Sequence, residues 1–323
     1  MSEVLVLVDH ADGAVNKPTY ELITIARRLG EPAAVFIGAA DKADAVAEAV
    51  KKYGAAKVYA VDDADIKGYL VAPEVDALEQ LAKQADPAAI LVPSSADGKE
   101  IAARLAVRLE SGLITDAVDV EAGDSSDAAP VTTQSVFAGN YTVKAKVTKG
   151  TPIVTVKPNA ATPEEAEGAA AVEQFAATVS DDAKKAQIVA SQPREKSGRP
   201  ELTEAAIVVS GGRGTGGNFD EVEAFADALG AAVGASRAVV DSGWKPHAFQ
   251  IGQTGKTVSP QLYVANGISG AIQHRAGMQT SQNIVAVNKD EEAPIFELVD
   301  FGVVGDLHTV LPAATEGINK RKG

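Results

Sequence analysis

AAIVVSGGRGTGGNFDEVEAFADAL, residues 205–229, runs from a β-branched segment through a glycine-rich turn into a segment with apolar residues at helical spacing. The apolar run at 205–209 predicts a buried strand, and 220–229 predicts a helix that Asn218 caps. In a strand–turn–helix unit, backbone N–H groups and the positive helix start can reach a phosphate. The unit therefore predicts a parallel α/β sheet that binds its ligand at the carboxyl ends of the strands.

The turn contains five glycines and Arg213. Gly212, Gly214 and Gly217 satisfy G-x-G-x-x-G, a pattern that is weak alone because a sharp turn also needs glycine. In this setting we interpret the turn as an anion site. An acidic residue closing the second strand would favour a nicotinamide dinucleotide, and Asp241 could take that part.

A second glycine segment, residues 250–257 (QIGQTGKT), resembles a nucleotide-binding loop but fails as one. Gln250 stands where the Walker A pattern requires glycine. No buried strand precedes the segment, and Pro260 follows where a long helix should begin, so ATP or GTP hydrolysis is excluded. The turn still presents backbone N–H groups and the Thr254 hydroxyl.

Two further segments place polar groups after predicted strands. Ser236 and Arg237 offer a hydroxyl and a guanidinium, although an exposed turn has the same composition. The apolar run 262–265 (LYVA) enters NGISGAIQH, where Ser269 lies near a positive helix start and His274 about a turn later. A lone histidine is more often structural, but its place beside a phosphate or ring site favours a functional role.

The last predicted strand ends carry Asn288 and, after the apolar segment 296–299 (FELV), Asp300 and Asp306. Asn288 and Asp306 suit an adenine or a ribose, although single residues of these types are more often turn formers. Five successive strand ends offer more phosphate and ring contacts than a mononucleotide needs. The C-terminal region is therefore predicted to bind an extended dinucleotide.

The N-terminal region alternates strands and helices. The predicted strands are 4–8, 33–37, 57–61 and 89–92, and the predicted helices are 20–29, 41–53, 74–84 and 99–109. Four such units in succession predict a parallel sheet with right-handed crossovers. Residues 131–147 alternate β-branched and polar residues around Gly139-Asn140 and predict an antiparallel hairpin, followed by a strand at 152–156. The fold class is α/β, with a parallel sheet extended by antiparallel strands.

The connector 159–175 is acidic and Ala-rich and is predicted to be solvated, and 176–194 is a candidate strand. The charged segment 195–200 (EKSGRP) has Gly and Pro without periodicity and is the best domain boundary. It divides the chain into domains at 1–195 and 196–323.

Asp9, His10, Ser94, Ser95 and Asp97 follow predicted strands of the first domain. No glycine cluster accompanies them, so we interpret them as caps and turns. No cofactor is expected in this domain.

Bulk composition excludes several classes of protein. The net charge of −14 argues against nucleic-acid binding. The absence of cysteine excludes disulfides, zinc thiolates and cysteine-ligated clusters, so redox chemistry would need a bound cofactor. The four histidines are dispersed, and no metal is expected. The chain has no signal-like start and no apolar run of ~18 residues, so a cytoplasmic protein without membrane insertion is expected.

Four segments of the C-terminal domain together resemble the electron transfer flavoprotein alpha-subunit family. They are VVSGGRG, GASRAVVDSGW, QIGQTGKTVSPQLYVANGISGAIQHRAGM and NIVAVNKDEEAPIFELVDFGVVGDL, in the family's order. GQTGK followed by LYVANGISGAIQH is highly specific. The glycine loop GGRGTGGNF is shorter than is common in the family.

The resemblance implies a C-terminal doubly wound parallel sheet that holds one FAD. It also implies a heterodimer with a beta subunit, which contacts the N-terminal domain and usually holds an AMP. Carried over by motif, the FAD contacts are expected to be Arg213, Ser236, Arg237, Ile251, Gly252, Gln253, Thr254, Ser269, Gly270, Ala271, Ile272, Gln273, His274, Asn288, Asp306 and Leu307.

The resemblance also implies roles. Thr254 is expected near flavin N5, His274 at the N1/C2-carbonyl edge and Arg237 beside the ring. The adenosine half is expected near Arg213, Asn288 and Asp306. A donor or cation at the N1/C2 edge stabilises the negative charge that reduction places there, so the protein would tune a potential.

The implied function is electron transfer without substrate turnover, so the chain is expected to be an electron carrier and not an enzyme. Electrons would come from flavin dehydrogenases, such as the acyl-CoA dehydrogenases of fatty acid β-oxidation. They would pass through a quinone oxidoreductase towards the respiratory chain.

Two other functions are compatible with the residues alone. An NAD-dependent oxidoreductase would need a general acid or base such as His247 or His308 near the nicotinamide. A non-redox nucleotide-binding scaffold subunit would bind adenine nucleotide without flavin absorbance.

Overall fold

The computed structural model describes residues 2–125, 128–137, 141–191 and 198–322. They form two compact units, one mainly before position 192 and the other mainly after position 197. The predicted boundary between residues 195 and 196 and the predicted hairpin turn Gly139-Asn140 lie outside the described residues.

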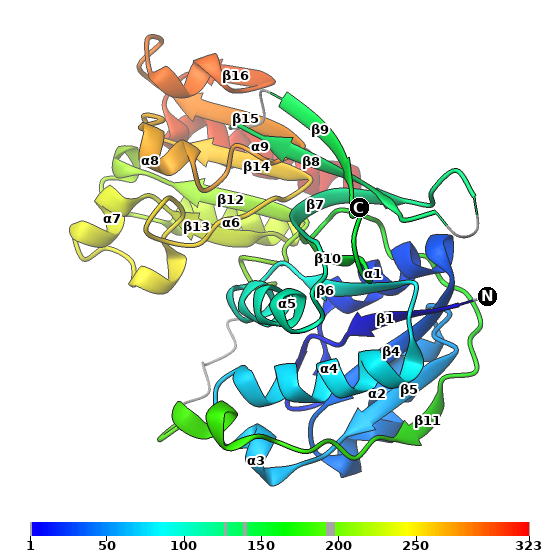
Figure 1. The fold of residues 1–323 in the computed structure, drawn as a ribbon. Helices are drawn as coiled ribbons and strands as arrows, with labels where there is room; N and C mark the ends of the chain where they lie inside the picture. Colours follow the sequence, from blue (N-terminus) through cyan, green and yellow to red (C-terminus); the bar gives the residue numbers. More distant parts are fainter. Residues whose placement is uncertain (1, 126–127, 138–140, 192–197, 323) are drawn as a thin grey trace. The chain divides into compact units, whose positions relative to one another are not determined.

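A nine-stranded sheet organises the first unit, in the order β11-β5-β4-β1-β6-β10-β7-β8-β9 (Figure 1). The strands are β1 Glu3–Leu7, β4 Glu31–Ile37, β5 Lys57–Val61, β6 Ala89–Pro93, β7 Leu113–Glu121, β8 Val131–Val136, β9 Tyr141–Lys146, β10 Ile153–Val156 and β11 Ala171–Gln174. Neighbours from β11 to β7 pair in parallel, and β7, β8 and β9 pair antiparallel. The predicted parallel sheet with an antiparallel extension is confirmed.

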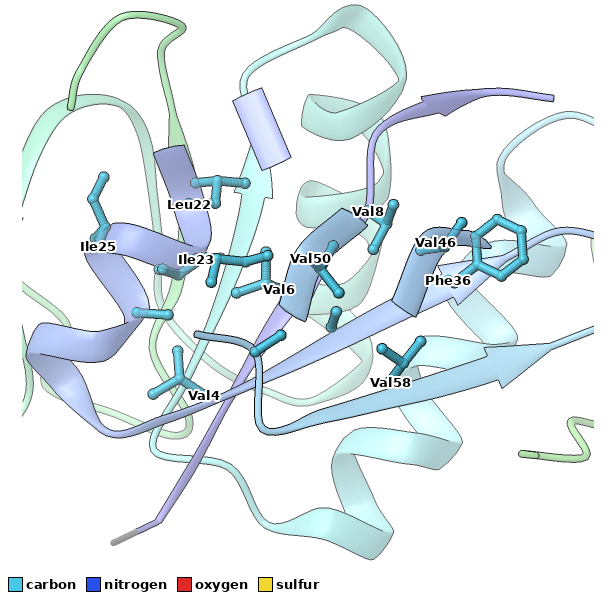
Figure 2. Packing of buried hydrophobic residues seen from close by; sticks show 14 of the residues in the cluster. Val4, Val6, Val8, Leu22, Ile23, Ile25, Phe36, Val46, Val50 and Val58 are labelled. Atoms are coloured by element: carbon cyan, nitrogen blue, oxygen red, sulfur yellow. The ribbon is translucent and has the colours of Figure 1, made fainter. Parts of the chain in front are cut away.

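Helices cover both faces of this sheet because the central strands alternate their side chains between two apolar cores. The remaining elements are β2 His10–Ala11, β3 Ala14–Val15, α1 Lys17–Leu29, η1 Ala40–Lys42, α2 Ala43–Lys51, α3 Ala64–Lys67, α4 Ala72–Ala85, α5 Ala96–Arg108 and η2 Asp181–Lys185. Val4 and Val6 pack with α1 and α2, as Figure 2 shows. Leu5 and Leu7 pack on the opposite face with α4 and α5.

The predictions for the chain after β10 were partly wrong. The predicted solvated connector 159–175 contains strand β11 at residues 171–174, which pairs with β5. Its four residues are all exposed, so no buried pattern marked it. The described part of 176–194 contains no strand, only the 3₁₀ helix η2.

A buried charged group ties the start of this connector to α1. Glu21 is 2% exposed, and its carboxylate forms a 3.1 Å ion pair with Lys17. The Asn159 backbone N–H donates to Glu21 Oε2 at 2.7 Å, and Lys17 Nζ donates to Asn159 Oδ1 at 2.5 Å. Burial raises the pKa of Glu21, and Lys17 opposes that shift.

We expect Glu21→Ala to destabilise the first unit by roughly 2–4 kcal/mol, because it leaves the buried Asn159 N–H without its acceptor and removes a buried ion pair. Hydrogen exchange of the α1 and β1 amides would measure this loss. Glu48→Ala is the control: Glu48 is 74% exposed in its pair with Lys51, and its loss should cost under about 0.5 kcal/mol. Equal losses of stability in Glu21→Ala and Glu48→Ala would contradict the stabilising role given to the buried Glu21 carboxylate.

A five-stranded parallel sheet, in the order β13-β12-β14-β15-β16, organises the second unit (Figure 1). The elements are β12 Ile207–Gly211, η3 Arg213–Thr215, α6 Asp220–Leu229, β13 Ala232–Ala235, α7 Arg237–Asp241, η4 His247–Phe249, β14 Leu262–Asn266, α8 Ile272–Arg275, β15 Asn283–Asn288, η5 Pro294–Glu297, β16 Phe301–Val304 and α9 Leu307–Lys322. The strand order reverses between β12 and β14, where α/β sheets of this type bind ligands.

The two faces of this sheet are covered differently. Phe225 of α6 and Leu311 of α9 pack on one face. Met278 and Ile251, from the long segment between β13 and β15, pack on the other face around Tyr263. The fifth strand, β16, begins at Phe301, after the apolar segment 296–299 (FELV). The first two residues of that segment lie in η5. In the described part of the chain, no helix is long and apolar enough to cross a membrane.

Candidate functional site

Two glycine turns meet at the point where the strand order reverses. The Gly212 N–H donates to Asn266 O at 2.8 Å, and the Gly214 N–H donates to Gly267 O at 3.0 Å. A Cβ on Gly212 would lie 2.2 Å from Gly267 O, and Gly267 has a φ of +62°. These positions need glycine because the two backbones touch.

The predicted glycine turn is compact. It forms the 3₁₀ helix η3, in which Thr215 Oγ1 donates to Gly212 O at 2.9 Å. Asn218 Oδ1 accepts the N–H of Asp220, the first residue of α6, at 2.9 Å, but Phe219 and not Asn218 holds the N-cap position. Arg213 is left exposed at the turn.

A cavity of about 730 Å³ lies at the carboxyl ends of all five strands. Its volume lies within the usual range of ligand sites. Among the predicted site residues, those that line it are Arg213, Ser236, Arg237, Ile251, Gly252, Gln253, Thr254, Ser269, Ala271, Gln273, His274, Asn288, Asp306 and Leu307. The structure thus brings together strand ends as far apart in the chain as Gly211 of β12 and Val304 of β16.

Gly270 and Ile272 are absent from the cavity lining. A Cβ on Gly270 would lie 2.5 Å from Ile295 N, so this glycine serves a close packing contact. Ile272 is 76% exposed. The lining also contains residues that the sequence did not single out, such as Lys289 and Asp290, whose one signal is that they directly follow β15.

The Walker-like segment forms a tight turn against α8. The Gln253 N–H donates to Gln273 O at 2.8 Å, and Gln250 Nε2 donates to Thr254 Oγ1 at 3.0 Å. A Cβ on Gly277 would lie 2.3 Å from Gly252 N, so the turn and the helix segment touch. A 3₁₀ helix precedes the turn, where a P-loop has a strand, which agrees with the rejection of that motif.

His274 is buried in the cavity wall, with 6% exposure. Its Nε2 lies 2.9 Å from the Tyr263 hydroxyl, and its Nδ1 has no hydrogen-bond partner among the residues described. Burial lowers the pKa of His274 to about 4. The ring is therefore neutral at pH 7, so it can act as a hydrogen-bond donor at that pH but not as a cation.

Arg237 and Asp241 lie one turn apart on α7, and Arg237 Nε donates to Asp241 Oδ2 at 3.2 Å. Asp241 ends a helix and not a strand, so it lacks the position that ribose recognition by a nicotinamide-binding fold requires. His247 does not line the cavity, whereas His308 lines it and its Nδ1 lies 3.1 Å from Glu221 Oε1. The positions of Asp241 and His247 weaken the NAD-dependent alternative, and His308 is the one candidate acid or base that the described cavity wall retains.

The described residues contain no cluster of three or more His, Asp or Glu side chains able to hold a metal ion.

Comparison with known proteins agrees with this architecture. The profile of the electron transfer flavoprotein domain matches residues 4–180, and that of the electron transfer flavoprotein FAD-binding domain matches residues 201–279. The chain is 56% identical over 326 aligned residues to the electron transfer flavoprotein subunit alpha of Mycobacterium leprae (strain TN), with 100% of both chains covered.

The chain belongs to the electron transfer flavoprotein alpha subunit family.

Relatives of this electron transfer flavoprotein family extend beyond mycobacteria. The chain is 44% identical to subunit alpha of Syntrophomonas wolfei, covering 99% of this chain and 100% of that one. It is 36% identical to subunit alpha of Bacillus subtilis, covering 97% and 96%. As an electron transfer flavoprotein alpha subunit, the chain is an electron carrier and not an enzyme, and its family implies a beta subunit as partner.

Proposed function

We propose that the chain binds one FAD in the cavity of its second unit and, with a beta subunit, carries electrons from flavin dehydrogenases, such as acyl-CoA dehydrogenases, towards a quinone oxidoreductase. The observation that carries the proposal is the buried Nδ1 of His274. This atom has no partner within the described residues and belongs to a cavity-lining side chain of a domain whose profile is FAD-binding.

The residues present fit a flavin dinucleotide. The cavity wall offers guanidinium groups from Arg213 and Arg237, hydroxyl groups from Ser236 and Thr254, and glycine turns that bring backbone close to a ligand. Guanidinium and backbone N–H groups suit a pyrophosphate, and neutral donors suit the carbonyl edge of a flavin ring.

We assign Thr254, His274 and Arg237 to the isoalloxazine and Arg213, Asn288 and Asp306 to the adenosine half. When bound, FAD would supply the electron-accepting ring. The chain's part is to hold the ring, exclude water and place donors where negative charge develops. A neutral His274 donor at the N1/C2 edge stabilises that charge without carrying a full charge of its own.

We also propose that the two domains have different roles. Residues 1–195 would supply contacts to the beta subunit and hold no cofactor, and residues 196–323 would hold FAD. The beta subunit would hold an AMP. Support comes from Ser94, which directly follows β6: its Oγ donates to Asp116 Oδ1 of β7 at 2.5 Å, and Lys99 of α5 pairs with Asp116 at 2.9 Å, so these polar groups satisfy one another.

The chain co-purified with its beta subunit is expected to be yellow and to contain one FAD per heterodimer. Anaerobic mixing with a reduced acyl-CoA dehydrogenase should bleach its flavin absorbance, which a stopped-flow spectrum measures. A colourless complex that binds NAD would instead support an oxidoreductase, and one that binds adenine nucleotide without flavin would support a scaffold subunit.

A further inference from the structure

Tyr263, a residue of the central sheet, contacts His274, the side chain proposed to donate to the flavin. Tyr263 lies on β14 and is fully buried at 0% exposure, within the core under the segment that carries α8. Its hydroxyl lies 2.9 Å from His274 Nε2, and the two rings are tilted by 57° with centroids 6.2 Å apart. A buried phenol needs a hydrogen-bond partner, and this histidine provides one.

Two arrangements of protons are open to this pair: the phenol donates to Nε2, or an Nε2–H donates to the phenol oxygen. Burial raises the pKa of Tyr263 above its ordinary value, so the phenol keeps its proton at neutral pH. A neutral imidazole has one donor and one acceptor nitrogen. When the phenol donates to Nε2, the ring carries its proton on Nδ1.

The two ring nitrogens have different surroundings. Nδ1 is buried and has no hydrogen-bond partner among the described residues, whereas Nε2 lies 2.9 Å from the Tyr263 hydroxyl. Because His274 belongs to the cavity wall, a proton on Nδ1 can be donated to a group that enters the cavity.

We propose that Tyr263 is a positioning residue that donates to His274 Nε2 and thereby holds His274 in the tautomer with its proton on Nδ1. The N–H on Nδ1 is then the one proton that the neutral ring can offer a flavin. This inference rests on the proposed FAD site for its functional meaning, although the tautomer itself belongs to the ligand-free chain. The Tyr263 donor also polarises the ring, which strengthens Nδ1–H as a donor.

The test has two readouts. In the full-length chain freed of flavin and labelled with ¹⁵N-histidine, ring nitrogen shifts at pH 7 report the tautomer. The His274→Gln spectrum identifies the His274 signals among the four histidines. The wild-type chain should show Nδ1 protonated and Nε2 unprotonated, and Tyr263→Phe should show a mixture of both tautomers. A wild-type Nε2–H tautomer, or an unchanged tautomer in Tyr263→Phe, would overturn the proposal.

The second readout is the potential of the first reduction step in the flavin-loaded heterodimer. Tyr263→Phe should retain FAD and lower the equilibrium constant of that step about tenfold, which is about 59 mV for a one-electron couple. An unchanged potential in Tyr263→Phe would overturn the proposal that Tyr263 acts on the flavin through His274.

Tyr59→Phe is the matched control, since Tyr59 is also buried but donates to Glu3 in the other unit at 2.9 Å. It should change neither readout. If Tyr263→Phe does not fold, the wild-type spectrum alone decides the tautomer. Failure of FAD to bind would contradict the proposed function and leave the tautomer measurement valid.

Discussion

The Gly212→Val chain is expected to lose at least about 100-fold of its affinity for FAD, roughly 2.7 kcal/mol. A Cβ at this position would lie 2.2 Å from Gly267 O and 2.7 Å from Ile268 Cγ1, closer than real Cβ atoms approach. Because the first obstacle is backbone, the two glycine turns have to separate. Their separation breaks the Gly212–Asn266 and Gly214–Gly267 hydrogen bonds and displaces the strand ends that line the cavity.

A fluorescence titration of the flavin-free heterodimer with FAD measures this loss. Gly216→Asn is the control from the same turn: Gly216 has a φ of +60°, an added Cβ would meet no atom within 4 Å, and asparagine tolerates that conformation. This variant should bind FAD within about threefold of the wild type. Tight FAD binding by Gly212→Val would show that the contact between the turns does not support the site.

The second large effect is a loss of stability in acid that depends on His274. Burial lowers the pKa of this side chain from 6.5 in the unfolded chain to about 4. Between these values the unfolded state binds more protons than the folded state, so stability is full above pH 6.5 and is lost as the pH falls towards 4. Between pH 7 and pH 4.5 this linkage amounts to roughly 2–3 kcal/mol.

Denaturant unfolding of the flavin-free chain at several pH values measures this change in the free energy of unfolding. The fluorescence of Trp244, the chain's one tryptophan, reports on the second unit. His274→Gln has no titrating ring and should lose roughly 2–3 kcal/mol less over the same pH interval. The difference between the two chains isolates His274 from the carboxylates. Parallel pH profiles would mean that the histidine is not buried as a neutral ring.

The sequence predicted strands β12 and β14 and helix α6 of the second unit because each has a local signature. It did not predict helix α9, and the FELV segment lies before strand β16 and not in it. The apolar run before Ser210, the glycine turn and Asn218 all lie within one short stretch. The meeting of this turn with Gly267 was not predictable, because it depends on β12 pairing with β14. The sequence likewise left open whether His274 is a neutral donor or a cation. Burial and the contact with Tyr263 make it a neutral donor, and both depend on the tertiary structure.

In the first unit, some strands have a sequence pattern that predicts them and others have none. The central strands β1, β4, β5 and β6 are nearly continuous apolar runs and were predicted. Strand β7 has an irregular pattern, LITDAVDVE, and β11 is exposed along its whole length, so neither has the period that marks a strand. Both are specified by the neighbours with which they pair.

The position of β10 in the middle of the sheet has a consequence for how the protein is made. β10 pairs with β6 on one side and β7 on the other, yet it follows the whole β7–β9 meander in the chain. While the ribosome is still synthesising residues before Ile153, the apolar strand β6 has a bare edge and β7 has no place in the parallel sheet. Such an edge is a template for pairing with other chains. A nascent or truncated chain that stops between β9 and β10 should therefore be a chaperone client and prone to aggregation, and the arrival of four residues, Ile153–Val156, closes the sheet.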